Sequence, residues 1–177
     1  FALGGEVKNV PIMVDNQDVG YNVTVGLNST SFDYGESITS ALLTDDRVKV
    51  TLCDFDFGKC GVDNGSCYAA LMIPGNFSEA LFKKTLSNAA TQLATNIQLI
   101  ISNSIPSGVN ETSLPFNITQ GIAQIQGNFD NATIVLYIDG TKPVNQASVI
   151  AALQSAFQSA FGSSSIELSK EFAFGNI

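Results

Sequence analysis

Apolar side chains recur with two different periods in the first half of the chain. Alternation of apolar and polar positions predicts a strand over 10–14, and a polar turn at 15–20 follows it. Apolar positions three and four residues apart predict a short helix over 38–44. Alternation returns over 48–52, and 68–73 is apolar throughout, which is typical of a strand covered on both faces.

The second half begins with a long amphipathic pattern. Apolar positions three, four and seven apart, starting near Ser78, predict a helix of about seven turns. Prolines and glycines over 104–130 favour loops, and a strand is predicted over 133–138. A helical stripe over 147–161 follows, in which Phe157 and Phe161 are interpreted as core residues, and an apolar pair at 166–168 predicts a last edge strand.

Strands that alternate with helices indicate right-handed crossovers. We therefore predict an α/β fold with a mixed, largely parallel sheet, helices packed on it, and a long amphipathic helix in a loop-rich insertion at 84–130. A length of 177 residues fits one domain, 1–177.

Composition excludes several functions. The chain has no histidine, which removes imidazole catalysis and His-ligated metal sites, and a net charge of −8 disfavours nucleic acid as a partner. No run approaches the roughly 18 apolar residues of a membrane span, and no signal peptide is visible, so the segment itself is expected to be soluble. Glycine-rich nucleotide loops are also missing from the sequence, so no cofactor and no enzymatic activity are predicted.

Asn-x-Ser/Thr triplets are the densest motif. Composition alone predicts about 2.5 of them. The sequence has seven, placed near turns or the ends of predicted elements: Asn22, Asn28, Asn64, Asn76, Asn110, Asn117 and Asn131. This excess predicts N-glycosylation and exposure to a secretory lumen or the cell exterior. The alternative is a Ser/Thr/Asn-rich chain whose triplets remain unmodified.

Three cysteines lie within fifteen residues, as expected for a disulfide in an oxidising compartment. A turn over 61–66 between Cys60 and Cys67 predicts that these two form a disulfide bridge, with Cys53 left unpaired. A three-cysteine metal site is the rival, but the spacing is not that of zinc knuckles.

Paired acidic residues are candidate carboxylate or calcium sites. The pairs are Asp15/Asp18, Asp45/Asp46 and Asp54/Asp56. The segment Asp54-Phe-Asp56 lacks the third ligand, the glycine and the closing glutamate of a calcium loop, so we interpret the pairs as turn residues and predict no metal. The turn at 15–18 follows the first strand, where open α/β sheets bind ligands, but a hydrogen-bonded Asx turn is the favoured interpretation.

Three phrases resemble the external domain of ABC-2-type transporter permeases. Residues 1–18, including Lys-Asn-Val-Pro-Ile-Met-Val-Asp-Asn-Gln-Asp, are similar to the segment that follows the family's first transmembrane helix. Residues 68–77, Tyr-Ala-Ala-Leu-Met-Ile-Pro-Gly-Asn-Phe, and 134–143, ending Asp-Gly-Thr-Lys-Pro, are similar to two later phrases. The chain departs from the pattern where residues 84–130 are longer than usual and where a cysteine turn replaces a helix.

The resemblance implies an extracellular, non-catalytic domain of a membrane transporter, placed at the plasma membrane or another secretory-pathway membrane. The glycan load points to eukaryotic ABCH-like or ABCG-like half transporters. Its partners would be the transmembrane domain of its own polypeptide and, in a homodimer, a second copy. Phe1 and Ile177 would then lie within roughly 10–25 Å of each other. The alternatives are a structural cell-surface glycoprotein, such as a filament or coat subunit, and a carboxylate hydrolase that no motif favours.

Overall fold

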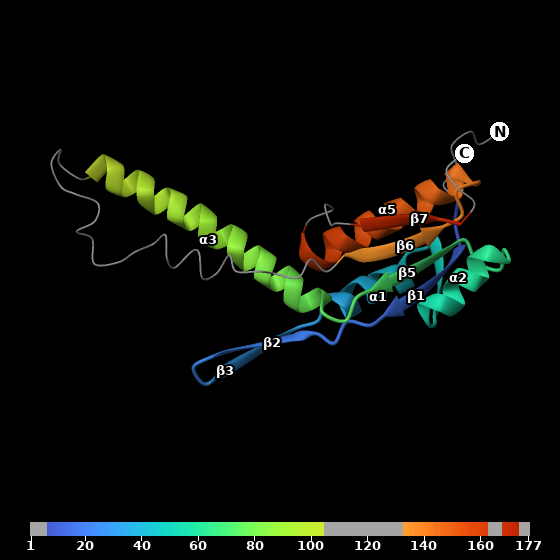
Figure 1. The fold of residues 1–177 in the computed structure, drawn as a ribbon, viewed down its shortest axis with the longest axis horizontal. Helices are drawn as coiled ribbons and strands as arrows, with labels where there is room; N and C mark the ends of the chain where they lie inside the picture. Colours follow the sequence, from blue (N-terminus) through green and yellow to red (C-terminus); the bar gives the residue numbers. More distant parts are fainter. Residues whose placement is uncertain (1–6, 105–132, 163–167, 174–177) are drawn as a thin grey trace. The chain divides into compact units, whose positions relative to one another are not determined.

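The computed structural model describes residues 7–104, 133–162 and 168–173. The chain divides into two compact units, of which unit 1 comprises Phe1–Ser78 with Ala132–Ile177 and unit 2 comprises Glu79–Asn131. Unit 1 contains a five-stranded sheet with helices on its faces (Figure 1). The predicted α/β class, with a mixed and mostly parallel sheet, is confirmed.

The sheet has the strand order β4-β1-β5-β6-β7. Its strands are β1 (Val10–Asn16), β4 (Val48–Leu52), β5 (Ala69–Ile73), β6 (Ile134–Ile138) and β7 (Leu168–Phe172). β1 is parallel to both β4 and β5, and β6 is antiparallel to β5 and parallel to β7. All five lie at or near predicted positions, and β7 is an edge strand as predicted.

Helices cover the two faces of this sheet unequally. They are α1 (Tyr34–Thr44), α2 (Phe55–Asp63) and α5 (Pro143–Phe161), while α3 (Phe77–Ser104) continues into unit 2. α1 and α5 pack on each other and on β1 and β4, whereas α2 packs on β5, β1 and β6. None of the helices within the described ranges has the length and hydropathy of a membrane span.

The main core lies between the sheet and the α1–α5 pair. Alternate residues of β1, β5 and β6 are buried on this face, together with one stripe of each helix. The stripe residues include Ile38, Leu42, Val149, Leu153 and Phe157. Phe157 is therefore a core residue, as predicted, and its ring stacks 6.1 Å from that of Phe161.

Two elements were not predicted. A hairpin of β2 (Tyr21–Val25) and β3 (Asn28–Phe32) follows β1 as a separate two-stranded sheet. The predicted cysteine turn is wrong at its start, because α2 occupies Phe55–Asp63 and contains Cys60. The expectation that a turn stands here in place of the family's helix is therefore wrong. The helix α2 connects β4 to β5 as a regular crossover.

Two glycines let α2 approach the sheet closely. A Cβ atom added at Gly58 would lie 2.9 Å from Cβ of Ala70 and 3.3 Å from Cβ of Met13. One added at Gly61 would lie 3.0 Å from Sγ of Cys67. Carbon atoms pack at about 3.5 to 4 Å, so Gly58 needs to be glycine for this helix–sheet contact, whereas a methyl group at Gly61 would require the Cys67 and Met13 side chains to shift.

Unit 2 is described only through α3, which confirms the predicted long helix from Glu79 onwards. Its first turns carry a Glu79–Lys83 ion pair, and Leu86, Leu93 and Leu99 are exposed among the described side chains. The loop-rich excursion predicted over 104–130 lies, after Ser104, outside the described residues.

The sheet has two ends, which we name by the direction of its strands. β1, β4 and β5 finish at the carboxyl rim, and the opposite end is the amino rim. The chain enters β1 and leaves β7 at the amino rim, because β7 is antiparallel to β1. Residues 79–131 join unit 1 at the carboxyl rim, where β5 ends and β6 begins.

One row of paired residues measures how close the two ends of the described sheet lie. Ile12 pairs with Ala69, Ala69 with Ile138, and Ile138 with Phe172. Three strand spacings separate Ile12 from Phe172, or about 14 Å. Phe1 and Ile177, for which the 10–25 Å separation was predicted, lie outside the described residues.

Candidate functional site

The carboxyl ends of β1 and β5 form the position where open α/β sheets most often bind ligands. From β1 the chain turns toward β4 through α1, and from β5 it turns the other way into α3. Beyond the strands the two segments stay paired, because Gln17 N donates to Ile73 O (3.0 Å) and Val19 N donates to Gly75 O (3.2 Å). The segments that follow β1 and β5 are therefore the first candidate for a binding site.

The carboxylate of Asp18 occupies this position. Its Oδ1 accepts a hydrogen bond from Ser78 N (3.0 Å), and its Oδ2 accepts from Gly35 N (3.0 Å) and from the Ser78 hydroxyl. Gly35 lies in the first turn of α1 and Ser78 in the first turn of α3. Helix N-termini attract anions through free N–H groups and the helix dipole, and here the anion is a side chain of the protein itself.

Ser78 completes the arrangement from the other side. Its hydroxyl accepts a hydrogen bond from Tyr34 N (2.8 Å) while donating to Asp18, and the residue is 0% exposed. Asn16 Oδ1 accepts from Asp18 N (3.2 Å), which is the Asx turn predicted at this position. We name the set Asp18, Ser78, Gly35 and Tyr34 the Asp18 clasp.

The clasp leaves little room for any other molecule. A Cβ added at Gly35 would lie 2.5 Å from Oδ1 of Asn16 and 2.6 Å from Cβ of Asp18, so only glycine fits. No buried side-chain nitrogen or oxygen lacks a partner within residues 7–104, 133–162 and 168–173. The arrangement is that of a structural lock between the starts of α1 and α3.

Asp15 performs the same task on the other face of the sheet. Its Oδ2 accepts from Phe55 N (3.0 Å), in the first turn of α2, and from Nε2 of Gln17 (2.8 Å). The segment 15–18 thus supplies carboxylates to the first turns of three helices, α1, α2 and α3. Sequence alone identified this segment but not its partners.

The other acidic pairs also act in turns and caps. Asp54 is the N-cap of α2 and accepts from Asp56 N (2.9 Å), and Asp45 is the C-cap of α1. For the described ranges, no group of three or more His, Cys, Asp or Glu residues could hold a metal ion. The interpretation as turn residues agrees with these contacts.

At the amino rim, two tyrosine hydroxyls form hydrogen bonds to segments next to β5 and β6. The Tyr68 hydroxyl lies at hydrogen-bond distance from Asp139 O and Lys142 O, and burial, aided by the charge of Asp139, raises its pKa to about 12. The Tyr137 hydroxyl donates to Asp63 Oδ1 (2.6 Å), and this bond raises the pKa of Tyr137 to about 12. Both remain protonated at neutral pH and act as hydrogen-bond donors.

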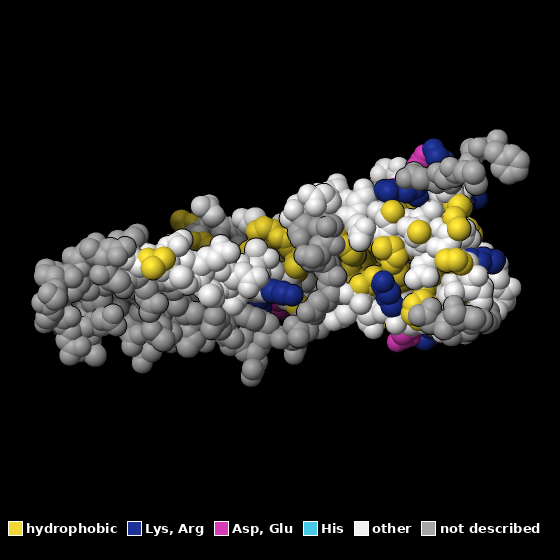
Figure 2. Space-filling view, turned by 90° about the horizontal axis from the view of Figure 1, so that it is seen from above, with side chains coloured by type: hydrophobic (Ala, Val, Ile, Leu, Met, Phe, Trp, Pro, Cys, Tyr) yellow, Lys and Arg dark blue, Asp and Glu magenta, His cyan; other side chains and the backbone are white. Residues whose placement is uncertain are grey.

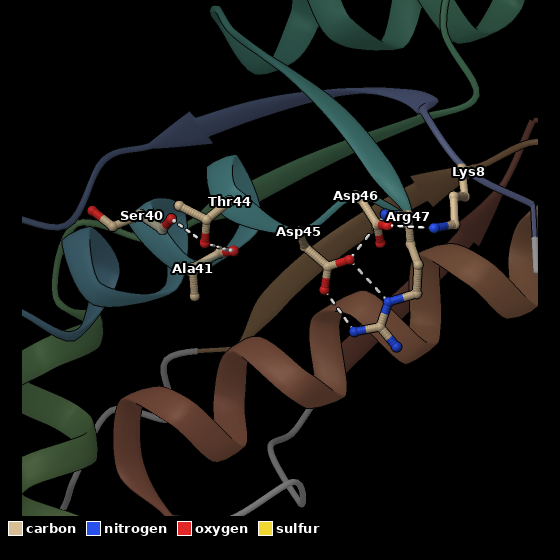
Figure 3. A network of polar contacts seen from close by, with 7 residues as sticks. All are labelled: Lys8, Ser40, Ala41, Thr44, Asp45, Asp46 and Arg47. Atoms are coloured by element: carbon tan, nitrogen blue, oxygen red, sulfur yellow. Dashed lines mark hydrogen bonds and ion pairs between the residues drawn. The ribbon is translucent and has the colours of Figure 1, made fainter.

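A second polar network joins α1 to the start of β4 and to the segment before β1 (Figure 3). The Arg47 guanidinium forks onto Asp45, with Nε donating to Oδ1 (2.9 Å) and Nη2 to Oδ2 (2.6 Å). Lys8 Nζ pairs with Asp46 Oδ2 at 2.6 Å, and the Thr44 hydroxyl donates to the backbone of α1. The exposed Lys8–Asp46 pair connects this network to the segment before β1.

This network predicts an acid-sensitive part of the stability. The hydrogen bond from Arg47 holds the pKa of Asp45 below its ordinary value of 3.8, although burial opposes the shift. A lowered folded-state pKa stabilises the fold above pH 3.8, and this contribution is lost as pH falls through the folded value. We expect Asp45→Asn to be destabilised relative to wild type at pH 7, and the difference to shrink below pH 3.8. Denaturant titrations of both proteins at pH 7 and below pH 3.8 measure this difference in the free energy of unfolding. A difference independent of pH would contradict the stabilising role of the Asp45 carboxylate.

The three cysteines are free thiols in the structure. Cys60 is exposed on α2, whereas Cys67 is buried with its Sγ toward Gly58 O (3.5 Å). Burial, with a smaller effect of the nearby Cys53, raises the pKa of Cys67 to about 11, and burial also raises that of Cys53. The predicted Cys60–Cys67 bridge is absent here and stays a prediction.

The rate of alkylation distinguishes free thiols from the predicted Cys60–Cys67 disulfide. With free thiols, Cys60 should react with iodoacetamide at pH 8 about two orders of magnitude faster than Cys67, because thiolate is the reactive form and Cys67 is buried. Cys67 should approach the rate of Cys60 only in denaturant, when the fold no longer buries it. If the predicted bridge exists, Cys60 will resist alkylation until a reductant is added. Peptide mass spectrometry distinguishes these results.

Four of the seven sequons fall on described residues, and the asparagine is exposed in each. Asn22 and Asn28 lie on the β2–β3 hairpin, Asn64 follows α2, and Asn76 precedes α3. The other three, Asn110, Asn117 and Asn131, lie outside the described residues. Exposure is what a glycan requires, so all four described positions remain candidates.

No single type of side chain, charged or hydrophobic, dominates the face shown in Figure 2. On this face, basic side chains lie singly or in small groups among neutral ones, and hydrophobic side chains lie between them. Comparison with protein-family models finds no match, and no curated protein or solved structure matches the chain. The function must therefore be argued from the residues themselves.

Proposed function

We propose that this chain is the extracellular domain of an ABC-2-type membrane transporter, where it caps or gates the exit of a lipid or amphiphile. Its partners would be the transmembrane domain of its own polypeptide and a second copy in a homodimer. ATP hydrolysis would belong to a separate nucleotide-binding domain.

One observation carries the proposal. The three phrases that resemble the permease family are far apart in the sequence, yet they contain β1, β5 and β6, three neighbouring strands of one sheet. The first phrase also ends at Asp18, and the second ends at Phe77, next to the Ser78 that Asp18 binds. The first two phrases therefore meet at the clasp, and the third contributes the strand next to β5, as expected if the three phrases belong to one domain core.

The topology supports the same proposal. A domain inserted between two membrane helices must return its chain to the membrane face it left. The described sheet begins and ends at the amino rim, with Ile12 and Phe172 in one row. In this proposal the amino rim faces the membrane, and the carboxyl rim, with the β2–β3 hairpin and the connection to residues 79–131, points away from it.

The site geometry supports a non-catalytic role. Asp15 and Asp18, the strongest candidates for chemistry at the carboxyl rim, are engaged by donors from the first turns of helices. A carboxylate held in this way positions helices. The domain is therefore proposed to act by contact with the rest of a transporter.

Purification of the full-length gene product in detergent tests this function. We expect an ATPase activity that depends on the nucleotide-binding domain and persists when residues 10–172 are replaced by a short flexible linker, while the isolated 177-residue chain hydrolyses no ATP. Loss of substrate export in the linker variant, with ATPase retained, would match a capping or gating role. A full-length product without membrane helices and without associated ATPase would overturn the proposal and favour a structural surface glycoprotein.

A further inference from the structure

The four described sequons differ in one respect that determines when they can be glycosylated. N-glycosylation requires a hydroxyl residue at the third position, so the transferase must contact that residue as well as the asparagine. In three sequons the third residue, Thr24, Thr30 or Ser66, is exposed, although the Ser66 hydroxyl donates to Gly61 O (3.3 Å) and Ser66 N donates to Asn64 Oδ1 (2.9 Å). In the fourth, the third residue is Ser78, which is 0% exposed.

Folding buries two-thirds of the Asn76 sequon. Phe77 is 1% exposed, and its ring lies 6.3 Å from that of Phe161 in α5. The Ser78 hydroxyl is committed twice, donating to Asp18 and accepting from Tyr34 N. Ser78 N is also bonded to Asp18, so neither the hydroxyl nor the backbone of this residue is available to an enzyme.

We propose that Asn76 is a folding-gated glycosylation site, which accepts a glycan only before the Asp18 clasp closes. This inference rests on the extracellular location in the proposed function. In the transfer, the Asn76 amide nitrogen forms a bond to C1 of the first sugar of a lipid-pyrophosphate-linked oligosaccharide. The bond from C1 to the pyrophosphate oxygen breaks, the lipid pyrophosphate leaves, and the amide nitrogen loses one proton.

The folded structure tolerates the product although it blocks the reaction. The Asn76 side chain is exposed, so a glycan attached earlier would extend into solvent without disturbing the clasp. Asp18 precedes Ser78 by 60 residues, so both halves of the clasp are present as soon as the sequon has been synthesised. Glycan transfer and clasp closure therefore compete for the same hydroxyl.

The test uses the folded, unglycosylated 177-residue chain with a purified oligosaccharyltransferase and lipid-linked oligosaccharide, and peptide mass spectrometry at each sequon. We expect transfer to Asn22 and Asn28 to be at least about tenfold faster than transfer to Asn76, because local opening must precede the last reaction. A synthetic peptide of residues 72–82 should accept the glycan readily. Asp18→Ala should raise transfer to Asn76 selectively, whereas Asp33→Ala, which removes the N-cap of α1 without touching Ser78, should not.

Each outcome decides the inference. Equal transfer to all four asparagines in the folded chain overturns it, as does failure of the peptide to accept a glycan. If no asparagine of the folded chain is modified, the protection is general, and a gate specific to Ser78 is excluded. Should Asp18→Ala fail to fold, wild-type chain in increasing denaturant replaces it, and Asn76 must become reactive as the clasp opens. None of these results depends on whether the full-length product is a transporter.

Discussion

Asp18→Ala is expected to lower the free energy of unfolding by about 3 kcal/mol, because hydrogen bonds to a charged group contribute roughly 1.5 to 3 kcal/mol each and a buried donor without a partner is costly. The substitution leaves Gly35 N, Ser78 N and the Ser78 hydroxyl without their acceptor. It also removes negative charge from the first turns of two helices at once. Urea unfolding followed by circular dichroism measures the loss.

Asp33→Ala is the matched control for this change. Asp33 caps α1 through Glu36 N (2.9 Å) but has no bond to α3. Removing a single N-cap costs about 1 kcal/mol. If both variants lose the same stability, Asp18 is only another helix cap, and the clasp does not join the two helices energetically.

Gly58→Ala is expected to destabilise the protein by about 1 to 3 kcal/mol, the usual cost of overpacking a core. In an isolated helix this exchange would be favourable, because alanine has the higher helix propensity. Here the new methyl group would lie 2.9 Å from Cβ of Ala70, so α2 must move away from the sheet. The sign of the change therefore reports the helix–sheet contact and not propensity.

Two further variants isolate that contact. Ala70→Gly in the Gly58→Ala background removes the opposing methyl group and should restore part of the loss, giving a coupling of about 1 kcal/mol in a double-mutant cycle. Phe57→Ala changes the neighbouring, exposed residue of α2 and should alter stability by no more than about 0.5 kcal/mol. A stabilised Gly58→Ala variant would contradict the close packing of α2 on β5.

The sequence predicted the elements whose apolar side chains face the core. The strands near residues 10, 48, 68 and 134 and the helices that became α1 and α5 follow from their periodicity, whereas α3 was predicted from the same spacing although Leu86, Leu93 and Leu99 are exposed in it. Burial on one face or on both produces that periodicity directly, which is why these predictions hold. Unit 1 is thus an α/β fold by the pattern of its sequence alone.

The missed elements lack such a pattern or contradict it. α2 contains Gly58 and Gly61, which have low helix propensity, and they are present because the helix lies close to Ala70 and Met13. Every residue of the β2 and β3 strands is exposed or half-buried, although Tyr21, Val23 and Val25 alternate before a Gly26 with positive φ. In α2, the close contact with the sheet outweighs the low helix propensity of glycine. In the β2–β3 hairpin, no buried face marks the strands in the sequence.

The clasp could be predicted only in part. An acidic turn at the end of the first strand was visible, and its Asx hydrogen bond was predicted. Its partners, Gly35 and Ser78, lie 17 and 60 residues further along, and no local pattern connects residues at such separations. A serine in the first turn of the long helix was the one available signal, and its meaning required the sheet topology.

Membrane fractionation of cells that express the full-length gene tests the central claim most directly. We expect the product to stay in the membrane pellet after alkaline carbonate extraction, and a deglycosylating enzyme added outside intact cells to lower its mass by several glycans. A product found in the carbonate supernatant or the culture medium, or one with an unchanged mass, would contradict an extracellular domain of a membrane transporter.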